Sequence, residues 1–233
     1  MKKIPILMYH SISNDKNNLS VNVDNFYQQM KTMINFGYKS VNLNEVLNND
    51  DEKKFVITFD DGYEDVFINA LPIINELKLK ATCFIVSNQI GKKNVWDTNK
   101  ENIPQMNLMS EKQISVWHKN GLEIGSHSLD HINLKKLSLD EKIKQIIEPK
   151  NLFKTKFNIN VNSFSYPFGI YDETCFKIIK ENYDFAVTTR RSRFDINKFE
   201  SHQIPRVPIN FNTSIYKFLI KVFTVYEDLK HKY

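Results

Sequence analysis

Two adjacent carboxylates, Asp60 and Asp61, follow a short apolar run and precede a glycine. The run, residues 55–57, has the composition of a buried strand. Two like charges at that place repel each other, and burying either one costs several kcal/mol unless a partner stabilises it. Such a pair suits hydrolysis, in which one carboxylate binds a cation and the other takes a proton from water. The alternative is a solvated turn with an aspartate cap for the next helix.

Two histidines, His127 and His131, are four residues apart. If this segment takes a helical turn, both side chains lie on one face and reach one metal ion. With a carboxylate from another strand end they would form a two-histidine, one-carboxylate site with open coordination positions. Such a site fits a hydrolytic Zn²⁺ or a non-haem Fe²⁺ oxygenase. The alternative is a pair of surface histidines.

These side chains share one feature, which is that each follows a predicted strand or lies near its end. The strands are residues 4–9, 55–59, 122–126, 161–166 and 203–207, and the side chains are His10, Asp60, Asp61, His127, Phe168 and Arg206. In a parallel barrel the carboxyl ends of all strands meet at one face, where active sites are built. We therefore expect these residues to lie together.

The chain alternates between predicted strands and predicted helices along its whole length. Three further strands are expected at 38–41, 81–86 and 185–188, and helices at 26–35, 45–47, 66–77, 110–119, 138–154, 173–181 and 213–229. Alternation of this kind implies parallel βαβ units, and seven or eight of them predict an α/β barrel of the TIM type. We expect residues 1–233 to form a single domain.

Several residues predict where the helices begin and where one is interrupted. Asp24 is the expected N-cap of the first helix. Ser110 with Gln113, and Ser138 with Glu141, have the spacing of capping boxes. Pro149 should kink or break the helix over 138–154.

Composition indicates an ordinary globular protein, with 41% hydrophobic and 25% charged residues. The net charge of +5 comes from scattered lysines and arginines, so nucleic acid is not an expected partner. Cys83 and Cys175 form neither a disulfide framework nor a metal-binding pattern. The apolar run 4–9 is too short for a signal peptide, and no segment reaches transmembrane length. These features predict a cytoplasmic protein, either free or peripheral at the inner membrane surface.

The carboxylate and histidine motifs also carry a family resemblance. Thr-Phe-Asp-Asp-Gly at 58–62 and His-Ser-Leu-Asp-His at 127–131 resemble the first two motifs of the polysaccharide deacetylases (NodB-homology, carbohydrate esterase 4). The likeness extends across most of the chain. It implies a distorted (β/α)7–8 barrel that removes N- or O-acetyl groups from sugars with one divalent metal. It also implies that Asp60 is the general base and that Asp61, His127 and His131 are the metal ligands.

The third motif departs from the common family pattern, Arg-x-Pro-Tyr. Residues 165–169 read Ser-Tyr-Pro-Phe-Gly. If the oxyanion donor of the family is a backbone N–H, Phe168 supplies it. Ser165 in place of arginine removes the cation that steadies the base. We expect Arg206 to replace it, because a guanidinium can hold a carboxylate through two hydrogen bonds.

The family's late Leu-x-x-His motif is missing after Arg206 and occurs instead as Leu-Met-Tyr-His at 7–10. This order resembles the circularly permuted branch that includes the poly-β-1,6-N-acetylglucosamine deacetylases. On that interpretation His10 is the general acid, whereas the alternative is a hydrogen-bonded histidine at a strand end. His118 and His202 are lesser candidates.

We therefore predict a metal-dependent deacetylase that hydrolyses the N-acetyl group of an amino sugar in a polysaccharide, lipid-linked or nucleotide-linked glycan. Zn²⁺ is the expected metal, with Fe²⁺, Co²⁺ and Ni²⁺ as alternatives. An inactive relative that binds metal and glycan is favoured only by the missing third-motif arginine. An iron oxygenase, in which Asp60 would be dispensable, is the other alternative. Oligomeric state is not predicted.

Two further segments have two interpretations each. The polar stretch 88–107 is expected to be a functional loop over one end of the fold, and its Trp96 is either a packing residue or a sugar-stacking platform. The predicted C-terminal amphipathic helix, 213–230, either packs on the barrel or a second subunit or lies on a membrane surface. Its apolar stripe comprises Ile215, Phe218, Leu219, Val222, Tyr226 and Leu229.

Overall fold

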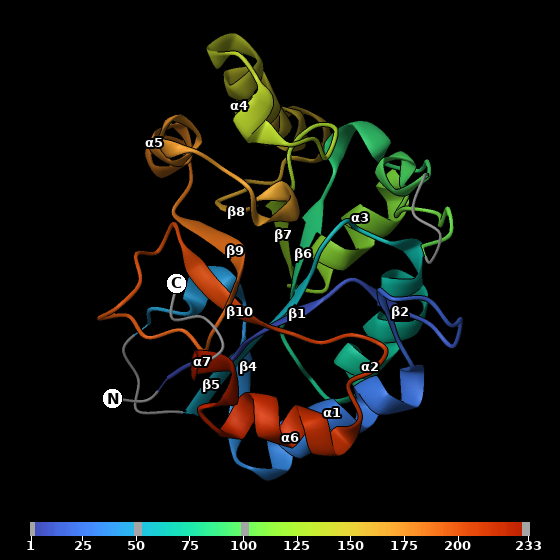
Figure 1. Ribbon diagram of the computed structural model, residues 1–233. Coiled ribbons are helices and arrows are strands. Elements are labelled where there is room, and N and C mark those ends of the chain that lie inside the picture. The colour runs from blue at the N-terminus through green and yellow to red at the C-terminus, as the bar shows by residue number, and fades with distance from the viewer. Residues whose placement is uncertain (1–2, 49–52, 99–102, 230–233) are drawn as a thin grey trace.

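The computed structural model describes residues 3–48, 53–98 and 103–229. Its parallel strands close into a barrel with helices around the outside (Figure 1). The ring runs in the order β1 (Ile6–Tyr9), β10 (Ile204–Pro208), β9 (Phe185–Arg191), β8 (Ser163–Ser165), β7 (Glu123–Ser126), β6 (Thr82–Ile85) and β5 (Lys53–Phe59), and β5 pairs with β1 to close it. The predicted parallel α/β barrel is confirmed, with these strands in the ring.

The remaining strands lie beside the ring. β4 (Tyr38–Val41) pairs with the first half of β5, whereas β6 pairs with its second half. β2 (Ser11–Ile12) and β3 (Ser20–Val21) form a small separate sheet directly after β1. The predicted strands 38–41 and 55–59 are therefore real, but the first of them does not belong to the closed ring.

Helices form the outer layer (Figure 1). The helices are α1 (Val23–Asn35), α2 (Leu71–Glu76), α3 (Glu111–Lys119), α4 (Leu139–Phe157), α5 (Glu173–Asn182), α6 (Ile215–Phe223) and α7 (Tyr226–Leu229). A π-helical turn, Val66–Ala70, precedes α2, and 3₁₀ turns occur at Leu43–Glu45, Ser87–Gln89, Val95–Asp97, Leu134–Lys136 and Pro167–Gly169. The loop predicted over 88–107 therefore contains a helical turn, and its residues 99–102 lie outside the described ranges.

Both predicted capping boxes are present, at the starts of α3 and α4. The predicted N-cap of the first helix is wrong. Asn22, two residues earlier than the expected Asp24, caps α1 by accepting hydrogen bonds from the N–H groups of Asp24 and Asn25. Pro149 does not break α4, which continues to Phe157. Ile146 and Phe153, both fully buried, pack this helix into the core on either side of the proline and offset the missing hydrogen bond.

The predicted C-terminal helix is divided in two. α6 ends at Phe223, and the extended backbone of Thr224 separates it from α7. Ion pairs turn the chain at this point, because buried Glu227 binds Arg191 and Lys221. Asp228 likewise binds Lys3 and Arg193. The charges thus fix α7 against the end of β9 and interrupt the apolar stripe after Val222.

The strands alternate between two buried surfaces, as their pattern of side chains requires. Leu7 and Ile57 pack outward in the cluster that also contains the apolar faces of the helices. The other set fills the lower barrel interior and includes Ile6, Val56, Phe84, Val187 and Ile204. Arg206 is two residues beyond Ile204 on the same strand. It lies above these apolar side chains and is fully buried. The barrel interior is therefore apolar at its base and polar towards the carboxyl ends of the strands.

Candidate active site

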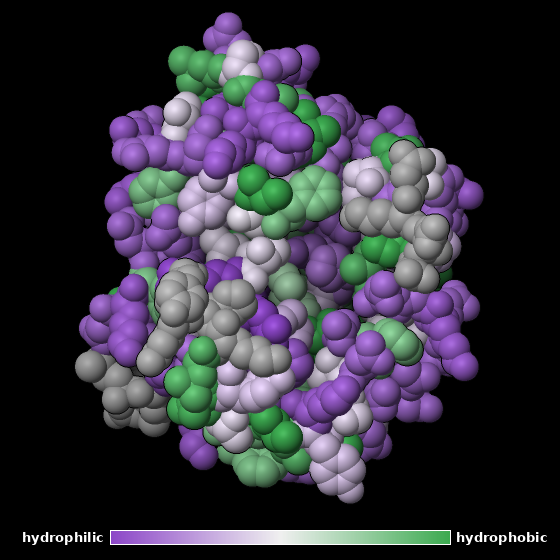
Figure 2. Space-filling view, in the orientation of Figure 1, coloured by the Kyte–Doolittle hydropathy of each residue, from purple (hydrophilic) through white to green (hydrophobic). Residues whose placement is uncertain are grey.

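A pocket of about 90 Å³ opens at the carboxyl ends of the strands. It is lined by His10, Leu19, Asp60, Asp61, Trp96, Asp97, Ile103, His127, His131, Tyr166, Phe168 and Thr189. All predicted site residues except Arg206 line it, and Arg206 lies directly beneath. Figure 2 shows the face onto which these strand ends open, where polar side chains predominate and apolar ones form small separate groups.

Three buried side chains at the floor of the pocket offer a ligand set for a cation. The Nε2 atoms of His127 and His131 each lie 3.3 Å from Oδ1 of Asp61. One ligand atom from each residue lies within 4.8 Å of the others. Among the described residues, Oδ1 of Asp61 has no hydrogen-bond partner although it is buried. A buried carboxylate oxygen without a donor is costly unless a cation binds it, so the three residues fit a divalent metal with nitrogen and oxygen ligands.

The hydrogen bond of His127 prepares its other nitrogen for a metal. Nδ1 of His127 lies 2.7 Å from the carbonyl oxygen of Ser165 and donates to it. A proton is thereby fixed on Nδ1, and Nε2 is the ring nitrogen that faces Asp61. Burial lowers the pKa of His131 to about 3, so its imidazole is neutral near pH 7 and suited to bind a metal. Burial alone would raise the pKa of Asp61, but the two histidines, chiefly His131, hold it well below its ordinary value.

The local backbone that places these ligands is strained. Asp61, Ser128, His131 and Phe168 all have positive φ angles, of 73°, 64°, 55° and 57°. The left-handed region is unfavourable for residues with a Cβ atom, and such strain gathers at functional sites. The segment 127–131 does not take a helical turn, and an irregular loop instead brings the two histidines together.

Gly62 meets a steric requirement next to Asp61. Its φ is +76°, and a Cβ atom there would lie 2.7 Å from Cδ1 of Ile85. A side chain at this position would therefore combine an unfavourable backbone angle with a collision. The glycine lets the chain turn directly after the two carboxylates.

Asp60 and Arg206 form a buried, doubly hydrogen-bonded ion pair. Nη1 of Arg206 donates to Oδ1 of Asp60 and Nη2 donates to Oδ2, both at 2.7 Å. The other donors of the guanidinium bind the carbonyl oxygen of Thr188 and the hydroxyls of Thr58 and Ser165. Burial would raise the pKa of Asp60, but Arg206 outweighs it and lowers that pKa. Arg206 therefore occupies the place predicted for it.

His10 lines the pocket and is half-buried. The residues after it are held by Asp65, which the sequence analysis missed. The hydroxyl of Ser11 donates to Oδ2 of Asp65 at 2.6 Å, and the N–H of Ile12 donates to Oδ1 at 3.1 Å. Asp65 thus fixes the turn that presents His10. The only signal for it in the sequence is its place at the start of the helical segment after the Asp-Asp-Gly motif.

Two aromatic rings pack against His131. The ring centroids of Trp96 and Phe168 each lie 4.5 Å from that of His131. Phe168 is 40% exposed, and Trp96 is half-buried. Trp96 therefore has a packing role, and it lines the pocket as well. Its neighbours Asn94 and Asp97 are buried and were also missed, because nothing in a polar loop sequence distinguishes an internal polar residue from a solvated one.

The two lesser histidine candidates do not line this pocket. His118 is exposed on α3. His202 is buried, and its Nε2 donates to the carbonyl oxygen of Tyr183 at 2.8 Å. A hydrogen-bonded structural role accounts for His202.

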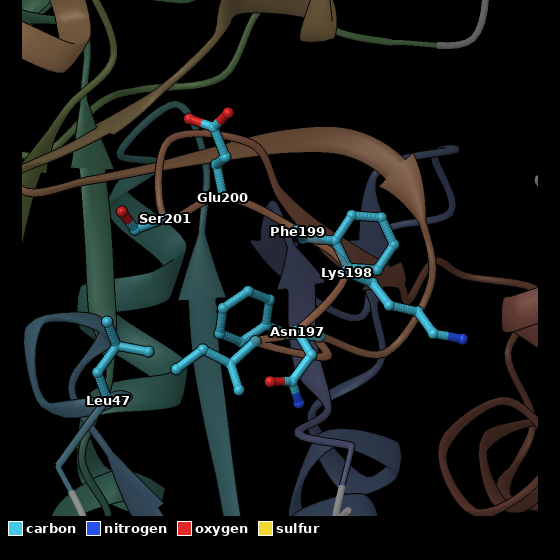
Figure 3. Close-up of a pocket in the computed structure, with 8 residues that line it drawn as sticks. Leu47, Asn197, Lys198, Phe199, Glu200 and Ser201 are labelled. Atoms are coloured by element: carbon cyan, nitrogen blue, oxygen red, sulfur yellow. The ribbon is translucent and has the colours of Figure 1, made fainter.

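A larger cavity, of about 370 Å³, shares no lining residue with this pocket. It lies between Leu47 and the segment 194–201 (Figure 3). Its two charged members, Lys198 and Glu200, point away from each other in Figure 3 and do not converge on a common point. The smaller pocket at the strand ends, which gathers the titratable side chains, is therefore the candidate active site.

Comparison with known proteins agrees with the fold and the motifs. The sequence model of the polysaccharide deacetylase family matches residues 47–183. The Bacillus subtilis protein YxkH is 34% identical over 194 residues, which are 80% of this chain and 64% of that protein. The poly-beta-1,6-N-acetyl-D-glucosamine N-deacetylase of Staphylococcus epidermidis is 26% identical over 98% of this chain and 82% of its own length.

Similarity also extends to solved structures. The Streptococcus pyogenes deacetylase PplD, solved in complex with acetate, superimposes with a TM-score of 0.79 at 26% identity. The match covers 94% of this chain and 98% of that structure. By contrast, the chain spans less than two thirds of the length of YxkH, namely 64%.

Proposed function

The chain belongs to the polysaccharide deacetylase family, and we propose that it is a metal-dependent hydrolase that removes the N-acetyl group from an amino sugar. Its N-deacetylase homologues indicate a hydrolase that acts on carbon–nitrogen bonds other than peptide bonds. One observation carries the proposal: a buried Asp61 oxygen without a donor lies between two histidine nitrogens, beside the Arg206-bound carboxylate of Asp60. This arrangement offers a cation site and a separate ionised carboxylate in one pocket.

Asp61, His127 and His131 would hold the divalent cation, and Zn²⁺ suits this donor set. When bound, the cation supplies Lewis acidity to the acetyl group and to the attacking water. Fe²⁺, Co²⁺ and Ni²⁺ also accept these ligands, so the choice among them is made by experiment.

The chain's own residues would transfer the protons and stabilise the negative charge that develops on the acetyl oxygen. Asp60, held by Arg206, takes a proton from the attacking water as the water oxygen bonds to the acetyl carbon. The backbone N–H of Phe168 stabilises the oxyanion. His10 then gives a proton to the amine nitrogen as the carbon–nitrogen bond breaks. The products are acetate and a free amino sugar.

The two alternative functions are less well supported. An oxygenase with the same ligands has no use for a carboxylate held ionised by a buried arginine beside the metal site. The inactive relative was favoured by the loss of the third-motif arginine, but Arg206 binds Asp60 in its stead. A deacetylase uses both the metal ligands and the carboxylate of Asp60 that Arg206 binds.

For the substrate we propose a glycan that contains N-acetylglucosamine. The support is the similarity to a Staphylococcus epidermidis enzyme whose name specifies poly-beta-1,6-N-acetyl-D-glucosamine. The test is acetate release from N-acetylglucosamine oligomers, from lipid-linked precursors and from nucleotide sugars. Protein stripped by a chelator would be assayed before and after reloading with Zn²⁺ or Co²⁺.

Two variants make this assay specific. Asp60→Asn should abolish acetate release while metal binding remains, whereas Asp61→Asn should abolish both. Release that needs the metal and Asp60 establishes the mechanism. Metal binding without acetate release from any of these substrates would contradict it and would favour the glycan-binding relative.

Membrane contact and a cytoplasmic location stay predictions. Within the described ranges no helix is both long enough and apolar enough to cross a bilayer. Phe218 and Val222 are buried, as expected for packing onto the barrel, whereas Tyr216 and Ile220 of the same helix are 76% and 46% exposed. Apolar groups appear at the lower edge of Figure 2, near α6. Sedimentation with anionic vesicles, before and after replacing Tyr216 and Ile220 by serine, tests surface binding.

A further inference from the structure

The two histidines of the site are held in different ways. His127 has a 2.7 Å hydrogen bond from Nδ1 to the carbonyl oxygen of Ser165. Nδ1 of His131 is buried and, within the part of the chain that the structure describes, has no hydrogen-bond partner. Metal-binding histidines commonly use such a bond to fix the ring. Something else must therefore set the orientation of the His131 imidazole.

Aromatic rings contact His131 on two sides. Trp96 packs against it at a tilt, with an interplanar angle of 30° and a centroid distance of 4.5 Å. Phe168 meets the imidazole edge to face, at 71° and again 4.5 Å. Contacts of this geometry are favourable beyond the area they bury, and together they restrict rotation of the imidazole.

Trp96 is itself fixed by the residues on either side of it. Asn94 is fully buried; its amide donates to Oδ2 of Asp97 at 3.2 Å, and its Oδ1 accepts the N–H of Met106 at 2.6 Å. The hydroxyl of Tyr63 lies 3.3 Å from the same Asp97 oxygen. Tyr63 is two residues beyond Asp61, so this network ties the loop to the turn that carries another proposed metal ligand.

We propose that Trp96 is a positioning residue that holds His131 in its metal-binding orientation, and that Asn94 and Asp97 hold Trp96. The inference rests on the proposed metal site. It adds that a loop which supplies no metal ligand holds one of the ligands in place. Trp96 acts through His131 in this role. Its effect should therefore appear in metal affinity, measured without any substrate.

The test is competition between the protein and a chromophoric chelator for Zn²⁺. Trp96→Ala should weaken Zn²⁺ binding roughly tenfold or more, as loss of a supporting contact at a metal site commonly does. Trp96→Phe keeps a ring against His131 and should bind within about threefold of the wild type. The visible absorption of bound Co²⁺ should change in the alanine variant and stay close to wild type in the phenylalanine variant.

A second variant acts from outside the pocket. Asn94→Ala removes the hydrogen bonds around Trp96 but no residue that lines the site. Like Trp96→Ala, it should weaken Zn²⁺ binding. Val95→Ala is the matched control in the same segment, since Val95 is 51% exposed, and it should bind Zn²⁺ as the wild type does. Circular dichroism confirms that each variant is folded.

The outcomes separate this inference from the proposed function. Wild-type Zn²⁺ affinity in folded Trp96→Ala, with acetate release lost, would overturn the positioning role and make Trp96 a substrate contact. Failure of the wild-type protein to bind any divalent metal would overturn the proposed function and this inference together. Weakened binding in Trp96→Ala and Asn94→Ala, with Phe rescue, supports the inference.

Discussion

Each carboxylate oxygen of Asp60 accepts a 2.7 Å hydrogen bond from a different terminal nitrogen of Arg206. The two residues are 146 positions apart; Asp60 directly follows β5 and Arg206 lies in β10, the two strands that flank β1. Both side chains are buried. The pair keeps the carboxylate ionised and fixes its direction, which is what a base beside a cation requires.

Removing only one member of this pair should be costly to the fold. Arg206→Met leaves a buried carboxylate without its cation and should lower the free energy of unfolding by about 3–5 kcal/mol. The double variant Arg206→Met with Asp60→Asn should recover much of that loss, because neither of these two positions then carries a charge. Urea denaturation measures both. A double variant no more stable than Arg206→Met would contradict the ion-pair explanation.

Loss of His10 should slow catalysis and leave metal binding intact. His10→Gln should reduce kcat about 10²–10⁴-fold, the usual contribution of a general acid. The reduction in kcat should be much smaller for 4-nitrophenyl acetate, because its leaving group needs no proton. An equal deficit on both substrates would instead show that His10 does not act as the acid.

Metal should stabilise the folded protein through Asp61, His127 and His131. At a free Zn²⁺ concentration about 100 times the Kd, linkage predicts about 2.7 kcal/mol of added stability. Thermal unfolding with and without a chelator measures the shift. In Asp61→Asn the shift should disappear, and a persisting shift would place the metal elsewhere.

The ion pairs of α7 predict a dependence of stability on pH. Burial would raise the pKa of Glu227, but Arg191 and Lys221 lower it below its ordinary value of 4.5. The carboxylate therefore contributes stability above pH 4.5, and this contribution is lost as the pH falls through its lowered pKa. Glu227→Gln should cost about 1–3 kcal/mol at pH 7.

The difference in the free energy of unfolding between Glu227→Gln and the wild type should become smaller below pH 4.5. Unfolding in urea at several pH values checks this, with Glu173→Gln as the control. Glu173 forms a solvent-exposed pair with Lys177, and its loss should cost less than about 0.5 kcal/mol. A difference for Glu227→Gln that is unchanged from pH 7 to pH 3 would refute the assignment.

Local sequence patterns determined the positions of the strands, two helix starts and the identity of the reactive side chains. Apolar runs set the strands, and Ser110 and Ser138 set two helix starts, because a capping box involves only residues three positions apart. The placement of His10, Asp60 and His127 followed from parallel strands, since their carboxyl ends must share one face.

Only the tertiary structure decided how those side chains are held. Arg206 reaches Asp60 past the intervening strand β1, and Trp96 reaches His131 from a loop, through contacts that no local pattern encodes. The positive φ angles at Ser128 and His131, and not a helical turn, bring the two histidines together, because the surrounding contacts outweigh the local preference. The division of the C-terminal helix has the same origin, since buried Glu227 binds charges from β9 and α6. Short-range patterns therefore predicted that the reactive side chains lie at one end of the barrel. Long-range contacts decided how these side chains are oriented.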